Sequence, residues 1–126
     1  MAKSRKAMSG RRVRKFGTQV RSLREQQEIG LRELAEIVGM SPAYLSMVER
    51  NELAPPAEEK VVSIAEALDQ DSDQFLALAG RISSDLPEVI TKNPTEMAAL
   101  VRATRGLTPP KIEALTQQAR KLKGRR

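Results

Sequence analysis

The sequence lacks the two residue types on which most catalytic and metal sites depend. Its 126 residues include no His and no Cys. Histidine is the usual general acid or base near neutral pH, and both residues are common zinc ligands. Without Cys, disulfide bonds and thiolate metal sites are excluded, which is compatible with an intracellular compartment. These residue types favour a binding protein over an enzyme, and we expect no metal and no cofactor.

The chemistry that the chain does offer is cationic and lies at its two ends. Residues 1–15 hold seven basic residues and residues 120–126 hold five, and neither segment contains an acid. Residues 16–119 hold the other ten bases and all 16 acids, which gives this part a net charge of −6. Basic arms on an acidic body are suited to neutralising the phosphates of a nucleic acid. The alternative is that each tail is only a solvated segment.

Apolar residues at helical spacing predict an all-α fold. The core must be almost entirely aliphatic, because aromatic residues make up 2% of the chain. Ser41-Pro42 is a helix start, since Ser caps a free N–H and Pro suits the first helical position. Gly39 and Asn51 follow predicted helices and tolerate the left-handed conformation. The pattern predicts a domain at residues 16–80, with five helices at about 16–27, 31–38, 41–50, 57–69 and 71–79.

Residues 81–126 are predicted to form a smaller helical segment that ends in a basic tail. Short helices are expected at about 85–92 and 94–104 and from Pro109 onward. Asn93 and Glu96 have the spacing of a capping box. The last two helices carry apolar stripes that need a partner surface. One partner would be a second copy of the chain, and the alternative is the first domain of the same chain in a monomer.

Two sequence runs, Leu31-Arg-Glu-Leu-Ala35 and Tyr44-Leu-Ser-Met-Val-Glu-Arg50, flank a turn at Gly39. Together with the small Ala35 and the buried positions Leu34, Val38, Leu45 and Val48, they resemble the Cro/C1-type, or XRE, family of helix-turn-helix transcriptional regulators. The resemblance covers about residues 16–80. It implies a lambda-repressor-like DNA-binding domain whose helix 41–50 enters the major groove. It also implies a structural ion pair between Arg24 and Glu49.

The resemblance further implies which residues contact double-stranded DNA. They lie on the exposed face of the two motif helices and in the N-terminal arm: Leu31, Arg32, Ser41, Pro42, Ala43, Tyr44, Ser46, Met47 and Arg50, with Arg11, Arg12 and Arg14. Tyr44 is expected to be exposed and to donate a hydrogen bond to a phosphate. Two alternatives stay open, since Ser41 would serve as a helix cap alone and Met47 as a filler of a surface groove.

The leading turn of the recognition helix departs from the family pattern. Better-known members have polar residues where Pro42, Ala43 and Met47 stand, and such residues hydrogen-bond to base edges, whereas these three offer only apolar contact. We therefore expect specificity to depend more on Ser46, Arg50, DNA shape and the basic arm.

The resemblance also suggests how the whole chain acts. One such domain buries little DNA, and family members usually dimerise to bind two half-sites. We expect dimerisation through Met97, Leu100, Val101, Ile112, Leu115 and Leu122. The predicted function is a repressor or autoregulator that binds an inverted repeat. The alternative is an antitoxin, or a repressor inactivated by a metallopeptidase, whose C-terminal helices bind that protein partner.

The expected location follows from the absence of two signals. No apolar run approaches the roughly 20 residues that span a bilayer, so no membrane association is expected. The N-terminus lacks the apolar segment of a secretory signal. We therefore expect a cytoplasmic protein that is associated with the nucleoid when it is bound to DNA.

Overall fold

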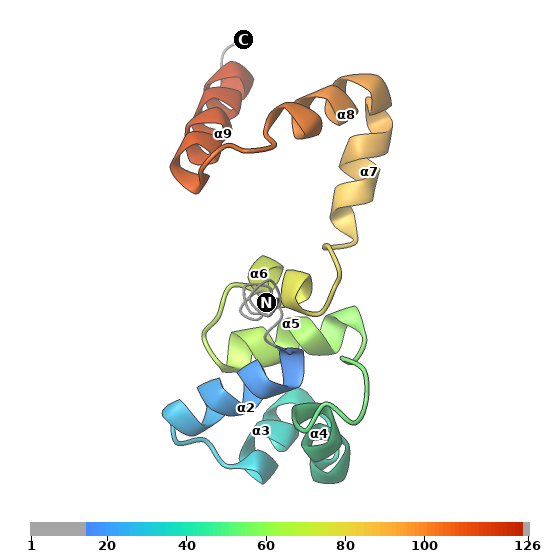
Figure 1. Ribbon diagram of the computed structural model, residues 1–126, viewed down its shortest axis with the longest axis vertical. Helices are drawn as coiled ribbons and strands as arrows, with labels where there is room; N and C mark the ends of the chain where they lie inside the picture. Colours follow the sequence, from blue (N-terminus) through green and yellow to red (C-terminus); the bar gives the residue numbers. More distant parts are fainter. Residues whose placement is uncertain (1–14, 125–126) are drawn as a thin grey trace, which may run out of the picture. The chain divides into compact units, whose positions relative to one another are not determined.

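All regular structure in the described residues, 15–124, is α-helical in this computed structural model. The helices divide into two units, with the boundary between Ser83 and Ser84. The first unit holds α2 (Phe16–Gln26), α3 (Leu31–Val38), α4 (Pro42–Glu49), α5 (Glu58–Ala67) and α6 (Ser72–Leu78) (Figure 1). The second unit holds α7 (Asp85–Lys92), α8 (Pro94–Ala103) and α9 (Pro109–Gly124). The predicted all-α fold is confirmed.

In the first unit, helix ends are set by residues that cap a helix or that adopt a left-handed backbone conformation. The Oγ atom of Ser41 accepts a hydrogen bond of 3.1 Å from the backbone N–H of Tyr44, and Pro42 is the first residue of α4. The turn that ends α3 places Gly39 at φ 72°, and the turn after α4 places Asn51 at φ 62°. Both are left-handed conformations that Gly and Asn tolerate best.

One helix boundary and one helix cap differ from the sequence prediction. Helix α5 ends at Ala67 rather than near Asp69, because Asp69 adopts a left-handed φ of 59° that cannot continue the helix. The capping box expected at Asn93 is not formed, since the side chain of Asn93 makes no cap hydrogen bond to α8. Its backbone, at φ −135° and ψ 69°, lies outside the usual range of a helix cap.

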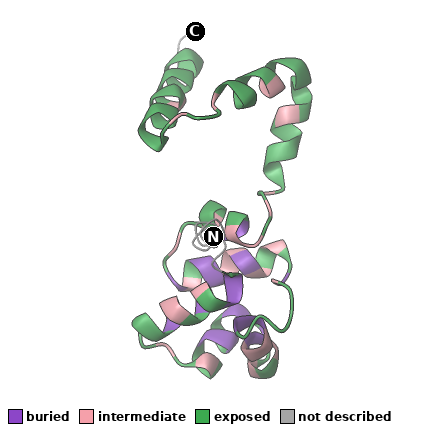
Figure 2. Cartoon of the chain, viewed as in Figure 1, coloured by how far each residue is buried: buried purple, intermediate pink, exposed green. Residues whose placement is uncertain are grey.

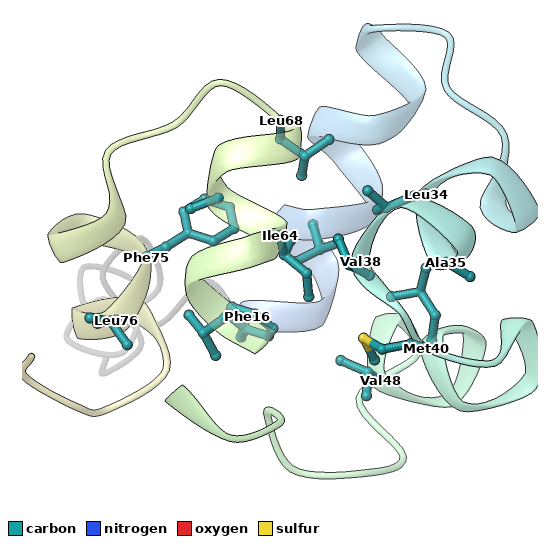
Figure 3. Packing of buried hydrophobic residues seen from close by; sticks show 14 residues of the cluster. Phe16, Leu34, Ala35, Val38, Met40, Val48, Ile64, Leu68, Phe75 and Leu76 are labelled. Atoms are coloured by element: carbon teal, nitrogen blue, oxygen red, sulfur yellow. The ribbon is translucent and has the colours of Figure 1, made fainter. Parts of the chain in front are cut away.

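The core of the first unit is built from fourteen buried apolar residues (Figure 3). They come from all five helices, the loop after α3 and the C-cap of α5, and the main helix contacts are α2–α4, α3–α4, α3–α5 and α5–α6. Phe16 and Phe75 meet edge to face, with ring centroids 5.7 Å apart. Because each fully buried aliphatic or aromatic side chain contributes about 1.5–3 kcal/mol, this cluster is the main source of stability.

The second unit has no comparable interior. Helices α7 and α8 contact each other, yet none of the described residues of α7, α8 or α9 is buried (Figure 2). Several large apolar side chains are more than two-fifths exposed, among them Leu100 at 49%, Val101 at 53% and Leu122 at 62%. These helices therefore present their apolar stripes without a core to cover them.

Candidate nucleic-acid interface

Helices α3 and α4 form a rigid pair because small and aliphatic side chains close the space between them. Ala35 and Leu34 of α3 are fully buried, as is Leu45 of α4. The chain turns between the helices at Gly39, and the next residue, Met40, donates its backbone N–H to the carbonyl oxygen of Ala35 at 2.9 Å. This bond satisfies a carbonyl at the end of α3, so the orientation of α4 is fixed by both packing and the turn.

A lysine from α5 holds the end of α3 from outside the motif. The Nζ atom of Lys60 donates to the carbonyl oxygen of Val38 at 2.9 Å. A cation at a helix C-terminus is favourable because the unpaired carbonyls carry partial negative charge. The same Nζ atom would lie 3.0 Å from a side chain added at Gly39. Sequence reasoning missed Lys60, since no local pattern links it to a turn 22 residues earlier.

Arg24 and Glu49 form a buried ion pair that joins α2 to α4. The Nε atom of Arg24 donates to Glu49 Oε2 at 2.8 Å and its Nη2 atom donates to Oε1 at 2.9 Å. Its Nη1 atom donates to the carbonyl oxygen of Ile29 in the loop before α3, also at 2.9 Å. Hydrogen bonding to Glu49 raises the pKa of Arg24, although burial opposes it, so the guanidinium stays charged. The pair thus connects the start of α3 and the end of α4 to α2.

Seven of the twelve residues assigned to DNA contact lie in α4 or are its two cap residues. Ser41, Ala43 and Arg50 are exposed, and Ser46 and Met47 are half-buried. Pro42 is also half-buried at the first turn. Ser41 caps the helix, so its hydroxyl oxygen already accepts one hydrogen bond while its proton is available to a second partner.

Two residues assigned to DNA contact also support the core. Tyr44 is half-buried rather than exposed, because its ring packs against the hydrophobic cluster. Leu31 packs against the same cluster at the start of α3, whereas Arg32 beside it is exposed. Substituting Tyr44 or Leu31 would therefore change packing together with any contact to a ligand.

Arg50 is held by two neighbours in a cluster that sequence reasoning did not find. Its Nε and Nη2 atoms donate to the two carboxylate oxygens of Glu52 at 3.0 and 3.1 Å, and its Nη1 atom donates to Ser46 Oγ at 2.5 Å. The hydrogen bonds raise the pKa of Arg50 and lower the pKa of Glu52, with the mutual attraction of their charges acting in the same direction. The signal that could have found Glu52 is its opposite charge two residues beyond Arg50, across a turn.

A hollow of about 280 Å³ lies beside this cluster. It is lined by residues from α2, the start of α3 and the end of α4: Arg21, Arg24, Leu31, Ser46, Glu49 and Arg50. The buried pair forms part of its wall, and Arg21 pairs with Glu25 at 3.1 Å across one helical turn. The hollow therefore brings three guanidinium groups together, each already paired with a carboxylate.

The charge of the first unit is negative apart from the N-terminal arm. Residues 16–83 contain six bases and twelve acids, whereas residues 84–119 contain four of each. Arg11, Arg12 and Arg14, which the sequence assigns to DNA contact, lie outside the described residues. In the described part of the first unit, Arg32 and Arg50 are the exposed bases on α3 and at the end of α4.

The residues assigned to dimerisation lie on α8 and α9 of the second unit. Leu100 and Val101 are on α8, while Ile112 at 41%, Leu115 at 42% and Leu122 are exposed on α9. Met97 on α8 is half-buried. None of these six side chains is buried within the second unit.

Two other features, groups of side chains that could hold a metal ion and helices able to cross a membrane, are absent from residues 15–124. No group of three or more Asp and Glu side chains in this part of the chain is arranged to hold a metal ion. No helix among the same residues is long and apolar enough to cross a membrane.

Comparison with known proteins assigns the first unit to a family. Residues 20–75, which run from within α2 to within α6, match the family model described as Helix-turn-helix, HTH_3. The chain therefore carries a helix-turn-helix domain of this family, of the Cro/C1-type class that its sequence motifs indicate. The predicted family is confirmed, and it is a family of DNA-binding regulators rather than enzymes.

Curated relatives match about half of the chain. Two curated HTH-type transcriptional regulators, from the CDC 1551 and H37Rv strains of Mycobacterium tuberculosis, are each 39% identical over 64 residues. The match covers 51% of this chain and 45% of each relative, so the chain spans about half the length of these curated relatives.

Two solved structures give matches of similar extent. The N-terminal DNA-binding domain of SinR from Bacillus subtilis is 30% identical, with a TM-score of 0.45, and the match covers 48% of this chain and 88% of that domain. The clp gene regulator ClgR from Corynebacterium glutamicum is 35% identical, with a TM-score of 0.44, over 52% of this chain and 83% of ClgR. Because these TM-scores are below 0.5, the family assignment rests on the sequence matches.

Proposed function

We propose that the chain is a transcriptional regulator that binds specific sequences of double-stranded DNA through α4. The observation that carries the proposal is the exposed face of α4, which the Gly39 turn and the Arg24–Glu49 pair hold outward in a helix-turn-helix domain. The major groove of B-DNA, about 12 Å wide, admits an α-helix. Ser46 and Arg50 supply hydrogen-bond donors on this face, and Ala43 and Met47 supply apolar contact to thymine methyl groups.

The affinity for DNA is proposed to come largely from the basic arm. Residues 16–83 carry twice as many acids as bases, so this part of the domain is repelled by phosphates at long range. The seven bases of residues 1–15 more than offset that net charge of −6. Arginines of such an arm would enter a narrow minor groove beside the recognition helix.

A homodimer is the proposed binding unit, with α8 and α9 as its interface. The support is the set of large apolar side chains on these helices that the chain itself leaves uncovered. Two copies would present two α4 helices to half-sites about 34 Å apart on an inverted repeat. Where that repeat overlaps a promoter, the bound dimer would act as a repressor or autoregulator. Such a protein would work in the cytoplasm, associated with the nucleoid.

The same uncovered stripes favour one alternative, in which α8 and α9 bind a different protein. The chain would then be an antitoxin bound to its toxin, or a repressor that a metallopeptidase inactivates. Sedimentation of the purified full chain at micromolar concentration separates the two proposals. A dimer supports self-association. A monomer that dimerises neither alone nor on DNA leaves the protein-partner alternative and the packing of these helices on the first domain of the same chain.

Selection from a randomised duplex library tests DNA recognition. The full chain should enrich an inverted repeat, because each copy presents the same α4 face. Arg50→Ala should reduce the enrichment, whereas the matched control Arg102→Ala, which removes an exposed arginine of α8, should leave the enriched sequence unchanged. A wild-type chain that enriches no sequence above the input library would contradict the proposal.

A further inference from the structure

The Arg50 guanidinium has two N–H groups that make no hydrogen bond within the domain. Three of its five N–H groups are engaged, two by the Glu52 carboxylate and one by the Ser46 hydroxyl. One N–H therefore remains on each of the two terminal nitrogens. The side chains of Arg50 and Glu52 are 48% and 54% exposed, so a ligand can reach the unused donors.

The turn after α4 places Glu52 over Arg50. The backbone N–H of Glu52 donates to the carbonyl oxygen of Met47 at 2.9 Å, and the left-handed Asn51 lies between the two charged residues. The Nδ2 atom of Asn51 donates to Thr18 Oγ1 of α2 at 2.9 Å, which anchors the turn to the body of the domain. The carboxylate of Glu52 is thus presented from a fixed backbone.

We propose that Glu52 is a positioning residue for DNA recognition, which holds Arg50 so that its two unused N–H groups face a pair of acceptors on DNA. This inference rests on the proposed function. The acceptor pair would be the O6 and N7 atoms of guanine or two oxygens of a phosphate, since both suit a guanidinium. Glu52 acts through Arg50 and does not itself contact DNA.

Arg50 is the residue that directly follows α4, and the other side chains at this surface explain why its restraint matters. Pro42 and Ala43 at the leading turn have no side-chain donors, so Arg50 carries the strongest directional donors on this face of α4. A restrained side chain loses less rotamer freedom on binding and accepts fewer alternative partners. The carboxylate also repels phosphates, so Glu52 should lower the affinity for all DNA while it raises the preference for the correct sequence.

Substitution of Glu52 separates these two effects. The probes are the duplex that the wild-type chain enriches from a randomised library and a scrambled duplex of equal length. Glu52→Gln should bind the scrambled duplex at least as tightly as wild type. Its preference for the enriched duplex should fall by roughly five- to tenfold, within the range that one bidentate contact contributes.

Glu25→Gln is the matched control. Glu25 also forms an exposed pair with an arginine, Arg21, and the substitution removes the same charge. Glu25→Gln should strengthen binding to the scrambled duplex about as much as Glu52→Gln does. It should leave the preference for the enriched duplex over the scrambled one unchanged. In an Arg50→Ala background, Glu52→Gln should cause no further loss of preference, because the residue acts only through Arg50. Unchanged thermal unfolding of each variant would show that the fold is intact.

The source of the acceptor pair follows from a selection with Arg50→Ala. Loss of a guanine at one position in each half-site identifies the base contact that a fall in preference requires. Equal weakening for every duplex identifies a phosphate contact and would overturn the role of Glu52 in sequence preference. A wild-type chain that enriches nothing would overturn the proposed function and this inference with it. If wild type enriches a sequence and Glu52→Gln keeps the full preference, only the role of Glu52 is overturned.

Discussion

Helices α2–α6 and helices α7–α9 both carry apolar faces, yet only the first group buries them. Fourteen apolar residues are buried in the first unit, and none in the described helices of the second. The difference teaches that helical periodicity identifies an apolar face but does not say which chain covers it. In the first unit the cover comes from neighbouring helices, whereas in the second we propose that it comes from another molecule.

The largest expected effect concerns the buried ion pair, which lies in the first unit. Arg24→Met leaves the Glu49 carboxylate, whose side chain is 4% exposed, without its partner. Removing one member of a buried pair costs about 3–5 kcal/mol, so the free energy of unfolding should fall by that amount. Urea denaturation followed by circular dichroism measures it.

The exposed pair on the same helix provides the control for this prediction. Arg21→Met should change the free energy of unfolding by less than about 1 kcal/mol, because Arg21 and Glu25 are both more than half exposed. The double substitution Arg24→Met with Glu49→Leu should recover much of the loss, since it removes the uncompensated charge. Equal costs for Arg24→Met and Arg21→Met would show that burial does not distinguish the two pairs.

The second prediction extends the comparison to charge, because residues 16–83 are acidic and residues 84–119 are neutral. Deleting residues 1–14 removes six bases and should weaken DNA binding. The plot of log affinity against log salt should become less steep by up to about 5, at roughly 0.9 for each phosphate that the arm no longer neutralises. Fluorescence anisotropy across a salt series measures this slope, and an unchanged slope would rule out a role for the arm.

The third prediction concerns a close approach of α2 to α4 at Gly17. A side chain added at Gly17 would place its Cβ 1.9 Å from the carbonyl oxygen of Val48, so the two helices must move apart. Gly17→Ala should lower the free energy of unfolding by about 2 kcal/mol. Gly124→Ala in α9, where nothing lies within 4 Å, is the control and should be neutral or slightly stabilising. Equal behaviour of the two variants would contradict the close approach of α2 to α4.

The smallest expected effect tests the second unit. Leu115→Glu places a charge on the exposed stripe of α9 and should raise the dissociation constant of the dimer by at least tenfold, or about 1.4 kcal/mol. The matched control is Ile37→Glu, since Ile37 is 58% exposed on α3 and belongs to the first unit. Sedimentation equilibrium compares the variants. A Leu115→Glu dimer as stable as wild type would place the interface elsewhere.

The features that the sequence predicts correctly are those with local causes. Ser41 begins α4 as expected, and Gly39 and Asn51 adopt the left-handed conformation that ends their helices. The bounds of α3 and α7 match the prediction because apolar spacing and flanking residues agree there. Local signals failed at Asn93, whose side chain suits a cap but whose backbone does not adopt the cap conformation.

The features that the sequence does not predict depend on contacts between distant residues or across turns. Gly17 lies close to the backbone of α4, and Lys60 donates a hydrogen bond to the backbone of α3. No local sequence pattern predicts either contact. The helical phase of Tyr44 predicts an exposed side chain, yet the hydrophobic cluster extends far enough to cover part of its ring. The sequence does not predict the pairing of Glu52 with Arg50, because it depends on the left-handed turn at Asn51.

The central claim is that helices α2–α6 recognise DNA and that helices α7–α9 join two copies of the chain. The mass of the complex between the chain and the enriched duplex tests this claim most directly. Analytical ultracentrifugation of the full chain with that duplex should give two chains for each duplex. Leu115→Glu should bind the two half-sites independently, so complexes with one chain should be populated at concentrations where the wild-type chain already gives two. One wild-type chain for each duplex at saturation would contradict the account.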